Sequence, residues 1–522
     1  MNNSKKYTEY VIFVILISTI IRGLIAGFIE LGNDEVYYRL YALYPDWSHF
    51  DHPFMVGLVM QLTTLNMLLQ SEFFMRLGSV IIGAVNIWIV FKIGIQIKDF
   101  RTGYYASLLY VASVYSSIIT GVFILPDAPQ SLFWLWAVYL IIKTIPQCPR
   151  APMSKVNMLK IGIVIGMGLL SKYTTIFLWF GIGAYIILFN RIWLTNKWLY
   201  YSIIATVLFT LPILIWNFQN DFISLTFHSE RVDMIGYSIN LNYFFTELGG
   251  EILYNNPINF TVILLSLLAA ARGGLDIDKK YTRMIILTGL PIIVIFLVFS
   301  LFRRTLPHWT APGYTSLIPL AAVFLSQKVS IKIKRLPIVL ISSLTLISVI
   351  IILGLAQINY GVFNFDKTTD YHRIGKDDPS LDMFGYKQTG KVFKQIVERD
   401  IQNGTMSENS FYTGSNWFPL ANYDYYAATP AGLKSLGIGK LGKIHKYAWI
   451  NNDNGGFDYG MDAYYITDSR EYNYPDTLFY SYFEDIIPAD TIQIYRNGKI
   501  AKRAFVFRMK NLIVIPNDVL KQ

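Results

Sequence analysis

Long apolar runs separated by short basic loops constrain this chain more than any other feature. An α-helix needs about 20 apolar residues to cross the hydrocarbon core of a bilayer. The runs lie at 11–29, 74–97, 104–122, 129–145, 157–171, 173–190, 198–216, 257–272, 283–301, 312–326 and 337–357. The chain is 53% hydrophobic and 15% charged, whereas an average soluble protein is about 25% charged. We therefore expect a polytopic α-helical membrane protein with about 11–13 transmembrane helices.

The basic residues predict the orientation of these helices. The net charge is +10, but residues 360–522 carry 19 basic and 19 acidic residues, so the excess lies in the hydrophobic part. A basic excess in the loops between spans follows the positive-inside rule and does not call for a nucleic-acid partner. We expect a cytoplasmic N-terminus and an extracytoplasmic C-terminal domain. The single cysteine, Cys148, excludes an intrachain disulfide.

Composition divides the chain into two expected domains. Residues 1–360 form the membrane domain, with outer loops at 30–73 and 217–256, the second of which is expected to contain an interfacial amphipathic helix. Residues 361–522 are charge-balanced, rich in Gly and Tyr, and long enough for one soluble α/β domain. There we expect a helix near 388–402, strands near 409–413, 463–467, 491–496 and 503–508, and a hairpin turn at Asn497-Gly498.

Ionisable residues gather on the predicted outer face. Residues 32–54 read GNDEVYYRLYALYPDWSHFDHPF and combine acids, histidines and aromatics. Cations are scarce on this face: Lys172 ends an apolar run, and Arg303 and Arg304 lie in a short link between two spans. An ionisable group at membrane depth is costly unless it is paired, so each is a functional candidate. Together these residues suit a site for a polar substrate at the membrane boundary.

Six short motifs point to a known family. They are Asp34-Glu35, Phe50-Asp51-His52-Pro53, Pro126-Asp127-Ala128-Pro129, Ser171-Lys172-Tyr173, Trp216-Asn217 with Phe227-His228, and Pro307-His308-Trp309. Through these motifs and their order, the chain resembles the GT-C glycosyltransferases of the dolichyl-phosphate-mannose–protein mannosyltransferase type. That group includes the bacterial aminoarabinose transferases of lipid A. The resemblance implies a GT-C fold, a polyprenyl-phosphate-linked sugar donor, inversion at the anomeric carbon, and an acid of the first loop as base. It also implies a bacterial cytoplasmic membrane protein with a C-terminal periplasmic domain.

The expected catalytic residues are Asp34, Glu35 and Asp127. An acceptor hydroxyl is a weak nucleophile, so a carboxylate is needed to take its proton, and Asp34 is the expected base. The alternative is that Asp34 caps the following helix. Glu35 is expected to hold the loop by hydrogen bonds. Asp127 would orient the acceptor or the partners of Asp34, or else cap the helix that follows it.

The leaving phosphate needs cations or hydrogen-bond donors, for which Lys172, Arg303 and Arg304 are the candidates. Lys172 could instead extend its ammonium to the membrane interface, and one of the two arginines could face lipid headgroups. His52 is expected near the phosphate, or else is a surface histidine. The remaining expected substrate-binding residues are Tyr37, Tyr38, Asp51, Tyr173, His228, His308 and Trp309. Tyr37, Tyr38 and Trp309 could stack on sugars or belong to an interfacial aromatic belt.

No cofactor is firmly expected. Asp51, His52, His228 and His308 allow a divalent metal by residue type, although they lack a compact spacing. The expected partners are the lipid-linked sugar, membrane lipids, and a lipid, protein or glycan acceptor. Two alternatives remain: a transporter or flippase for lipid-linked sugars, which favours ionisable groups at mid-bilayer and inverted repeats, and an enzyme like the O-antigen ligases.

Overall fold

The computed structural model describes all residues except 1, 152, 233–237, 329–335, 367 and 522. Its contacts separate the chain into two compact units, which we call the membrane unit (Met1–Ala26 and Pro45–Ile350) and the sheet unit (Gly27–Tyr44 and Ile351–Gln522). The division at 360/361 drawn from composition stays a prediction. The partition by contacts differs from it by assigning residues 27–44 to the sheet unit.

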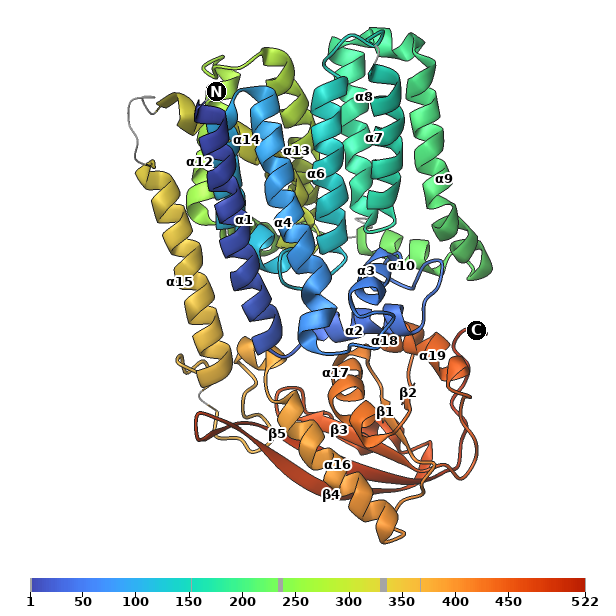
Figure 1. Ribbon diagram of the computed structural model, residues 1–522. Helices are drawn as coiled ribbons and strands as arrows, with labels where there is room; N and C mark the ends of the chain where they lie inside the picture. The colour runs from blue at the N-terminus through green and yellow to red at the C-terminus, as the bar shows by residue number, and fades with distance from the viewer. Residues whose placement is uncertain (1, 152, 233–237, 329–335, 367, 522) are drawn as a thin grey trace. The chain divides into compact units, whose positions relative to one another are not determined.

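The membrane unit is built from helices. They are α1 (Asn2–Phe28), α3 (Met55–Thr63), α4 (Glu72–Ile97), α5 (Phe100–Ala112), α6 (Asp127–Thr144), α7 (Ser154–Leu169), α8 (Phe177–Phe189), α9 (Lys197–Gln219), α10 (Ile223–Val232), α11 (Leu241–Tyr254), α12 (Pro257–Ala271), α13 (Lys279–Phe299), α14 (Ala311–Lys328) and α15 (Ile338–Tyr360) (Figure 1). Short helical turns join them: η1 (Tyr115–Ile119), η2 (Tyr173–Ile176), η3 (Arg191–Thr195) and η4 (Pro307–Trp309).

Five described helices are long and apolar enough to cross a membrane: α1 (from Ser4), α4, α9, α13 and α15. A sixth candidate is the pair α11 and α12, which passes the same test together but is bent by 100°. In α15 only 17% of the most apolar window is buried, so most of its apolar side chains are available to lipid. The protein is therefore a multi-pass membrane protein. The count of about 11–13 spans stays a prediction.

The apolar run predicted as one span at 104–122 is not one helix. α5 ends at Ala112, and Ser113 takes an extended backbone conformation (φ −79°, ψ 135°). The Ser113 hydroxyl donates to the carbonyl oxygen of Tyr254 at 3.1 Å, and the π-helical turn η1 follows. π-Helical turns are rare and occur often at functional sites.

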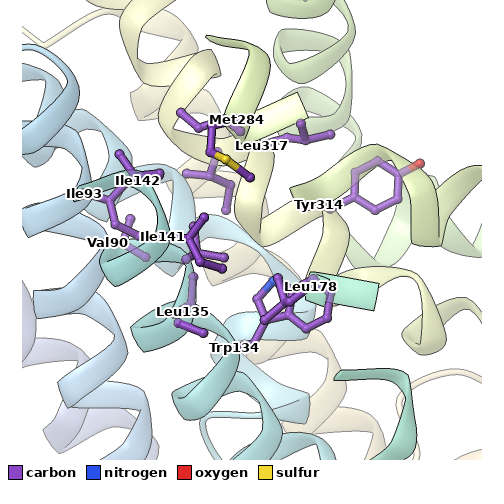
Figure 2. Packing of buried hydrophobic residues seen from close by; sticks show 14 of the residues in the cluster. Val90, Ile93, Trp134, Leu135, Ile141, Ile142, Leu178, Met284, Tyr314 and Leu317 are labelled. Atoms are coloured by element: carbon purple, nitrogen blue, oxygen red, sulfur yellow. The ribbon is translucent and has the colours of Figure 1, made fainter. Parts of the chain in front are cut away.

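The core of the membrane unit is centred on α6, whose side chains are buried on most sides. Trp134, Leu135 and Ile141 of α6 pack among residues of α4, α8, α13 and α14 (Figure 2). The indole of Trp134 donates to Ser316 Oγ at 2.8 Å, which satisfies its one polar atom inside the core. This hydrogen bond fixes the position of α6 relative to α14. The site described below begins at the first residue of α6.

The sheet unit is an α/β domain, as the sequence predicts. Its helical elements are α2 (Asn33–Leu43), η5 (Pro379–Met383), α16 (Tyr386–Gln402), α17 (Trp417–Tyr423), η6 (Asp424–Ala428), η7 (Thr429–Ala431), α18 (Leu441–Ile444), α19 (Tyr447–Asp453) and α20 (Pro475–Phe479). Its strands are β1 (Phe411–Gly414), β2 (Ser435–Gly437), β3 (Ala463–Asp468), β4 (Phe483–Arg496) and β5 (Lys499–Leu512). The sheet order is β2-β1-β3-β5-β4, with β1 parallel to β2 and β3, and β5 antiparallel to β3 and β4.

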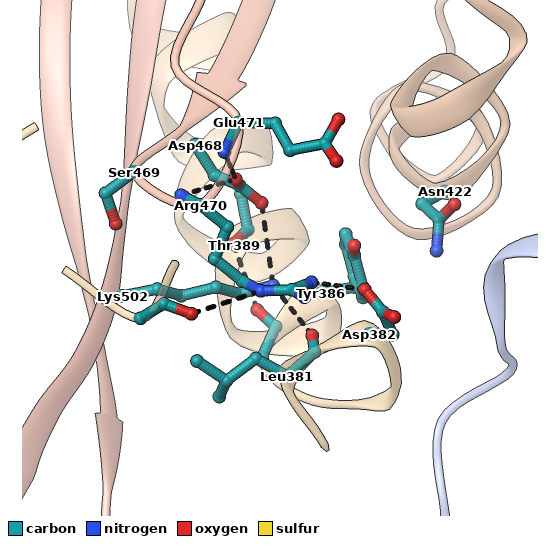
Figure 3. Close-up of polar contacts among 12 residues, drawn as sticks. Leu381, Asp382, Tyr386, Thr389, Asn422, Asp468, Ser469, Arg470, Glu471 and Lys502 are labelled. Atoms are coloured by element: carbon teal, nitrogen blue, oxygen red, sulfur yellow. Dashed lines mark hydrogen bonds and ion pairs between the residues drawn. The ribbon is translucent and has the colours of Figure 1, made fainter. Parts of the chain in front are cut away.

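Buried charges inside the sheet unit are closely surrounded by partners. The side chain of Lys502 is fully buried, donates to the carbonyl oxygen of Leu381 at 3.3 Å, and lies 3.7 Å from Asp468 Oδ2 (Figure 3). Its ammonium also lies 3.9 Å from the centre of the Tyr386 ring. Burial lowers the pKa of Lys502, and the charge of Asp468 opposes that shift. Arg470 is paired with Asp382 in the same network.

The segment 27–44 is an integral part of the sheet unit. The Tyr37 ring packs 5.0 Å from the Trp417 ring, between centroids, and the Arg39 guanidinium lies 3.9 Å from an Asp424 carboxylate oxygen. The amide of Tyr386 donates to Glu30 Oε2 at 2.8 Å. These contacts join residues 27–44 to segments more than 340 positions later in the sequence.

Candidate functional site

A buried ion pair lies where α6 begins. Lys172 Nζ is 3.0 Å from Asp127 Oδ1 and 2.9 Å from Oδ2, and the two residues are 5% and 3% exposed. A buried charge is stable only when it is paired and hydrogen-bonded. The sequence singled out both residues as functional candidates, and the structure brings them together across 45 positions of sequence.

Local structure fixes both partners of this pair. Asp127 is the first residue of α6, and its side chain binds Lys172 instead of capping the helix, whose N-cap is Pro126. One turn later Gln130 donates to Thr174 Oγ1 at 2.7 Å and to Thr175 Oγ1 at 3.2 Å. α6 therefore holds the turn after Lys172 at two places, through Asp127 and through Gln130.

Tyr115, in the π-helical turn η1, is a third member of the site. Its hydroxyl donates to Asp127 Oδ1 at 3.4 Å, and the residue is fully buried. Sequence reasoning missed Tyr115 because it is one of 36 tyrosines and lies in a run that reads as an ordinary span.

The loop before α3 reaches the same region. The Met55 amide donates to the carbonyl oxygen of Leu170 at 3.2 Å, next to the turn that carries Lys172. The Trp216 indole donates to Asp46 Oδ2 at 2.8 Å, and His228 Nε2 donates to the carbonyl oxygen of Asp51 at 2.7 Å. The loop is thus fixed against the α7–η2 turn, the end of α9, and α10.

Three aromatic residues from separate motifs meet beside this loop. The His228 ring lies 5.9 Å from the His52 ring and 5.1 Å from the Tyr173 ring, between centroids. The Tyr173 and Ser224 hydroxyl oxygens are 3.2 Å apart, within hydrogen-bond distance. His52, Tyr173 and His228 were each expected to bind substrate, and the structure places them side by side.

The histidines near the ion pair are neutral at pH 7. Burial lowers the pKa of His52 to about 3, a shift that Asp51 opposes and Lys172 reinforces. Burial likewise lowers the pKa of His308 to about 4, with Asp127 opposing the shift. Both rings keep part of their surface exposed. Each can therefore donate one N–H to a ligand and accept a hydrogen bond at its other nitrogen.

His308 comes from the segment between α13 and α14. It lies in η4 next to Trp309, whose ring packs 5.4 Å from the Phe296 ring, between centroids. In the same segment Arg303 is half-buried and Arg304 is exposed. Trp309 therefore packs on α13, which favours a packing role for this ring.

Four expected site residues belong to the sheet unit. Asp34 is exposed in the first turn of α2. Glu35 is 2% exposed, and its Oε2 accepts a hydrogen bond from the Gly32 amide at 2.9 Å, which closes that turn. Tyr37 and Tyr38 are 1% and 6% exposed, so burial favours packing over sugar stacking for both rings.

The sequence also missed Arg22, a buried cation in α1. Its Nη2 donates to the carbonyl oxygen of Ser116 at 3.2 Å and to Ser117 Oγ at 3.4 Å, both in η1. Arg22 is 2% exposed. A charge inside the first apolar run was the available clue, because charges in membrane segments are rare and functional by default.

Among the described residues, no group of three or more His, Cys, Asp or Glu side chains is arranged to hold a metal ion. Asp51, His52, His228 and His308 are all described, so the structure adds no support for a metal at these residues.

The arrangement suits an oxyanion at the membrane boundary. A lysine ammonium has three donors, and Asp127 takes two hydrogen bonds from Lys172. The third donor and the N–H groups of neutral histidines can bind phosphate oxygens. Asp127 holds the ammonium in a fixed orientation while this happens.

Comparisons with known proteins address the fold. Residues 51–216 match the family described as dolichyl-phosphate-mannose-protein mannosyltransferase. The crystal structure of ArnT from Cupriavidus metallidurans in the apo state superposes with a TM-score of 0.62 at 14% identity, covering 97% of this chain and 98% of that one. ArnT bound to undecaprenyl phosphate gives the same score and identity, covering 96% of this chain and 98% of that one. No curated protein sequence matches the chain. At this identity the structural likeness establishes the fold.

Proposed function

We propose that the chain is a GT-C glycosyltransferase similar to the protein mannosyltransferases and ArnT, and that it transfers a sugar from a polyprenyl-phosphate-linked donor. The acceptor is a hydroxyl or phosphate group of a lipid, protein or glycan, and the anomeric carbon is inverted. Two facts support a donor of this kind: the family match over residues 51–216 and the undecaprenyl phosphate bound by the ArnT neighbour.

The observation that carries the proposal is the buried Lys172–Asp127 pair beside neutral, half-exposed histidines. In the reaction the acceptor oxygen bonds to C1 of the sugar, the bond from C1 to the phosphate oxygen breaks, and its electron pair leaves with the phosphate. Lys172 and the N–H groups of His52 and His308 bind the oxygens on which this charge develops. Asp127 holds the lysine ammonium in place.

Asp34 is the proposed base that takes the proton of the acceptor hydroxyl. Its exposure in the first turn of α2 supports this role, because the carboxylate can be reached from solvent. Glu35 supports Asp34 indirectly by closing the same turn through the Gly32 amide. Arg303 and Arg304 are proposed as weaker phosphate or headgroup contacts.

The experiment uses the full chain in proteoliposomes with a polyprenyl-phosphate sugar and extracted envelope lipids or proteins as acceptors. We expect Asp34→Asn to abolish transfer while membrane insertion is unchanged. Asp221→Asn, which changes an exposed acid in another outer segment, is the matched control and should transfer normally. Wild-type transfer by Asp34→Asn would remove Asp34 as the base. Mass spectrometry of envelope lipids and proteins with and without the gene would identify the sugar and the acceptor.

The proposed location is the bacterial cytoplasmic membrane, with the N-terminus in the cytoplasm and the C-terminal domain in the periplasm. Cys148 is exposed, and it lies in a loop that this orientation assigns to the cytoplasm. A membrane-impermeant maleimide should therefore label Cys148 only after the membrane is opened. Labelling of Cys148 in intact spheroplasts would reverse the proposed orientation.

A further inference from the structure

α11 carries two glutamates that the proposed reaction does not use. Glu247 and Glu251 are one turn apart and are 1% and 0% exposed, whereas Phe245 and Leu253 on the same helix are 63% and 62% exposed. The helix thus turns its acidic face into the protein and its apolar face outward. Burying a carboxyl group is costly unless it is hydrogen-bonded, so the partners of these two residues indicate what the helix does.

Both glutamates bind the segment 301–314, which contains the link after α13 and the first turn of α14. Thr305 Oγ1 donates to Glu247 Oε2 at 2.8 Å, and the Tyr314 hydroxyl donates to Glu251 Oε2 at 2.9 Å. Before α11, the Asn240 amide donates to the carbonyl oxygen of Leu301 at 2.7 Å. The segment 301–314 is therefore held at its start, near its middle and at its end.

Packing places α11 directly on the centre of this segment. A Cβ atom added to Gly250 would lie 2.1 Å from Pro307 Cγ and 2.8 Å from Pro307 Cβ. Only a glycine allows the helix to approach Pro307 so closely. The neighbouring Gly249 faces open space, with no atom within 4 Å of an added Cβ.

Pro307 precedes His308, and His308 interacts electrostatically with both Asp127 and Lys172. We propose that Glu247, Gly250 and Glu251 are positioning residues, which hold the segment 305–314 so that His308 faces the Asp127–Lys172 pair. The inference rests on the proposed function for its effect on sugar transfer. The placement of His308 can be tested without that function.

The two helices between α9 and α12 contact different parts of the site. α10 supplies His228, which contacts the rings of His52 and Tyr173. α11 binds the segment 301–314, which carries His308. A shift of that segment by about 1 Å is enough to reduce a rate up to 100-fold without removing any group that contacts substrate.

The test compares Gly250→Ala with Gly249→Ala, two adjacent and chemically identical changes. We expect Gly250→Ala to lower kcat by about 10- to 100-fold with a smaller change in KM, because the added methyl displaces Pro307. Gly249→Ala should stay within about twofold of the wild type, because the added Cβ atom would have no other atom within 4 Å. Equal kcat values for the two variants would overturn the inference.

Conservative and disruptive changes at Glu247 give a second measurement. Glu247→Gln keeps an oxygen that accepts the Thr305 hydrogen bond, so kcat should stay near the wild-type value. Glu247→Leu and Thr305→Val remove the bond and should lower kcat to a similar extent. A Gln variant as impaired as the Leu variant would contradict a positioning role through this hydrogen bond.

A labelling experiment separates this inference from the proposed function. In a Cys148→Ala background, His308→Cys is labelled with a maleimide, and the rate is measured with glycine or alanine at position 250. We expect faster labelling with Gly250→Ala and no change with Gly249→Ala. An unchanged rate with Gly250→Ala overturns the inference. A faster rate in a protein whose wild type transfers no sugar supports the placement of His308 and overturns the proposed function instead.

Discussion

The membrane unit and the sheet unit each bury a carboxylate that binds a cation and a tyrosine. Asp127 binds Lys172 and Tyr115, whereas Asp400 binds Arg508 and Tyr464. In the sheet unit the guanidinium binds both carboxylate oxygens. Arg508 Nε and Nη2 lie 2.6 and 2.8 Å from the two oxygens of Asp400. A planar guanidinium fork matches a carboxylate at both oxygens, which makes such a pair well suited to a structural role.

The pair in the membrane unit differs in its cation and its neighbours. Lys172 presents a compact ammonium with a third donor, next to neutral histidines that are only half-buried. We propose that the same carboxylate arrangement serves stability in the sheet unit and holds a ligand-binding cation in the membrane unit. The identity of the cation and its surroundings separates the two roles.

The strongest test of this contrast removes the lysine. We expect Lys172→Met to lower sugar transfer by about 10²–10³-fold and to destabilise the membrane unit by about 3–5 kcal/mol, because Asp127 is left buried without its partner. The double variant Lys172→Met/Asp127→Leu should recover most of the stability but none of the transfer. Recovery of transfer in the double variant would show that the pair has only a structural role.

The corresponding change in the sheet unit should affect stability alone. Arg508→Met should lower the free energy of unfolding by about 3–5 kcal/mol, and Arg508→Met/Asp400→Leu should recover most of this loss. Limited proteolysis of the sheet unit measures both changes. Arg399, a half-exposed second neighbour of Asp400 at 3.4 Å, is the control. Arg399→Ala should cost at most about 1 kcal/mol, as surface pairs do. Similar losses for both arginines would contradict a special role for the Arg508 fork.

Acid should weaken the membrane unit through its histidines. In the unfolded chain each histidine has a pKa of about 6.5. In the folded chain burial lowers the pKa to about 3 for His52 and to about 4 for His308. Protons therefore favour the unfolded state between these values, and stability present above about pH 6.5 is lost as the pH falls. Thermal unfolding midpoints from pH 7 to pH 4.5 should fall less steeply for His52→Gln/His308→Gln. Parallel slopes for the variant and the wild type would exclude these histidines as the cause.

The smallest expected effect concerns Arg22, which has no carboxylate within ion-pair distance among the described residues. A Cβ atom at Gly121 would lie 2.7 Å from Arg22 Nε and from the carbonyl oxygen of Ser116. Gly121→Ala should therefore destabilise the membrane unit by about 1–3 kcal/mol through overpacking. Gly23→Ala, whose nearest contact would be Phe73 at 3.7 Å, is the control in α1 and should be nearly neutral. Thermal unfolding midpoints measure both variants. Equal midpoints for Gly121→Ala and Gly23→Ala would contradict the expected overpacking around Arg22.

Local rules predicted much of the sheet unit. The turn at Asn497-Gly498 has positive φ at both residues, 50° and 76°, as a tight hairpin requires. The helix expected near 388–402 is α16 (Tyr386–Gln402). β4 begins at Phe483, well before the predicted 491, because it is an edge strand and tolerates Pro488 within it. β2 was missed because three residues, Ser435–Gly437, are too short for any periodicity.

For the site, the sequence identified residues but not their partners. Asp127, Lys172 and His308 stood out because ionisable groups are rare beside apolar runs. That Lys172 binds Asp127, that Tyr115 joins them, and that Glu247 holds Thr305 depend on helix packing, which periodicity within one segment does not encode. Arg22 was missed although the sequence held a clue to it, since this charged residue interrupts the first apolar run.

The position of α2 has a consequence for how the protein is made. Residues 27–44 leave the ribosome early, yet Tyr37 and Arg39 pack against Trp417 and Asp424. At about 5–20 residues per second, the ribosome needs roughly 15–60 s more to reach the rest of the sheet unit. During that delay Tyr37 and Arg39 of α2 lack their contacts with Trp417 and Asp424. A chain that stops before residue 351 would lack the last part of α15 and would leave this early segment permanently without its partners, exposed to chaperones and proteases.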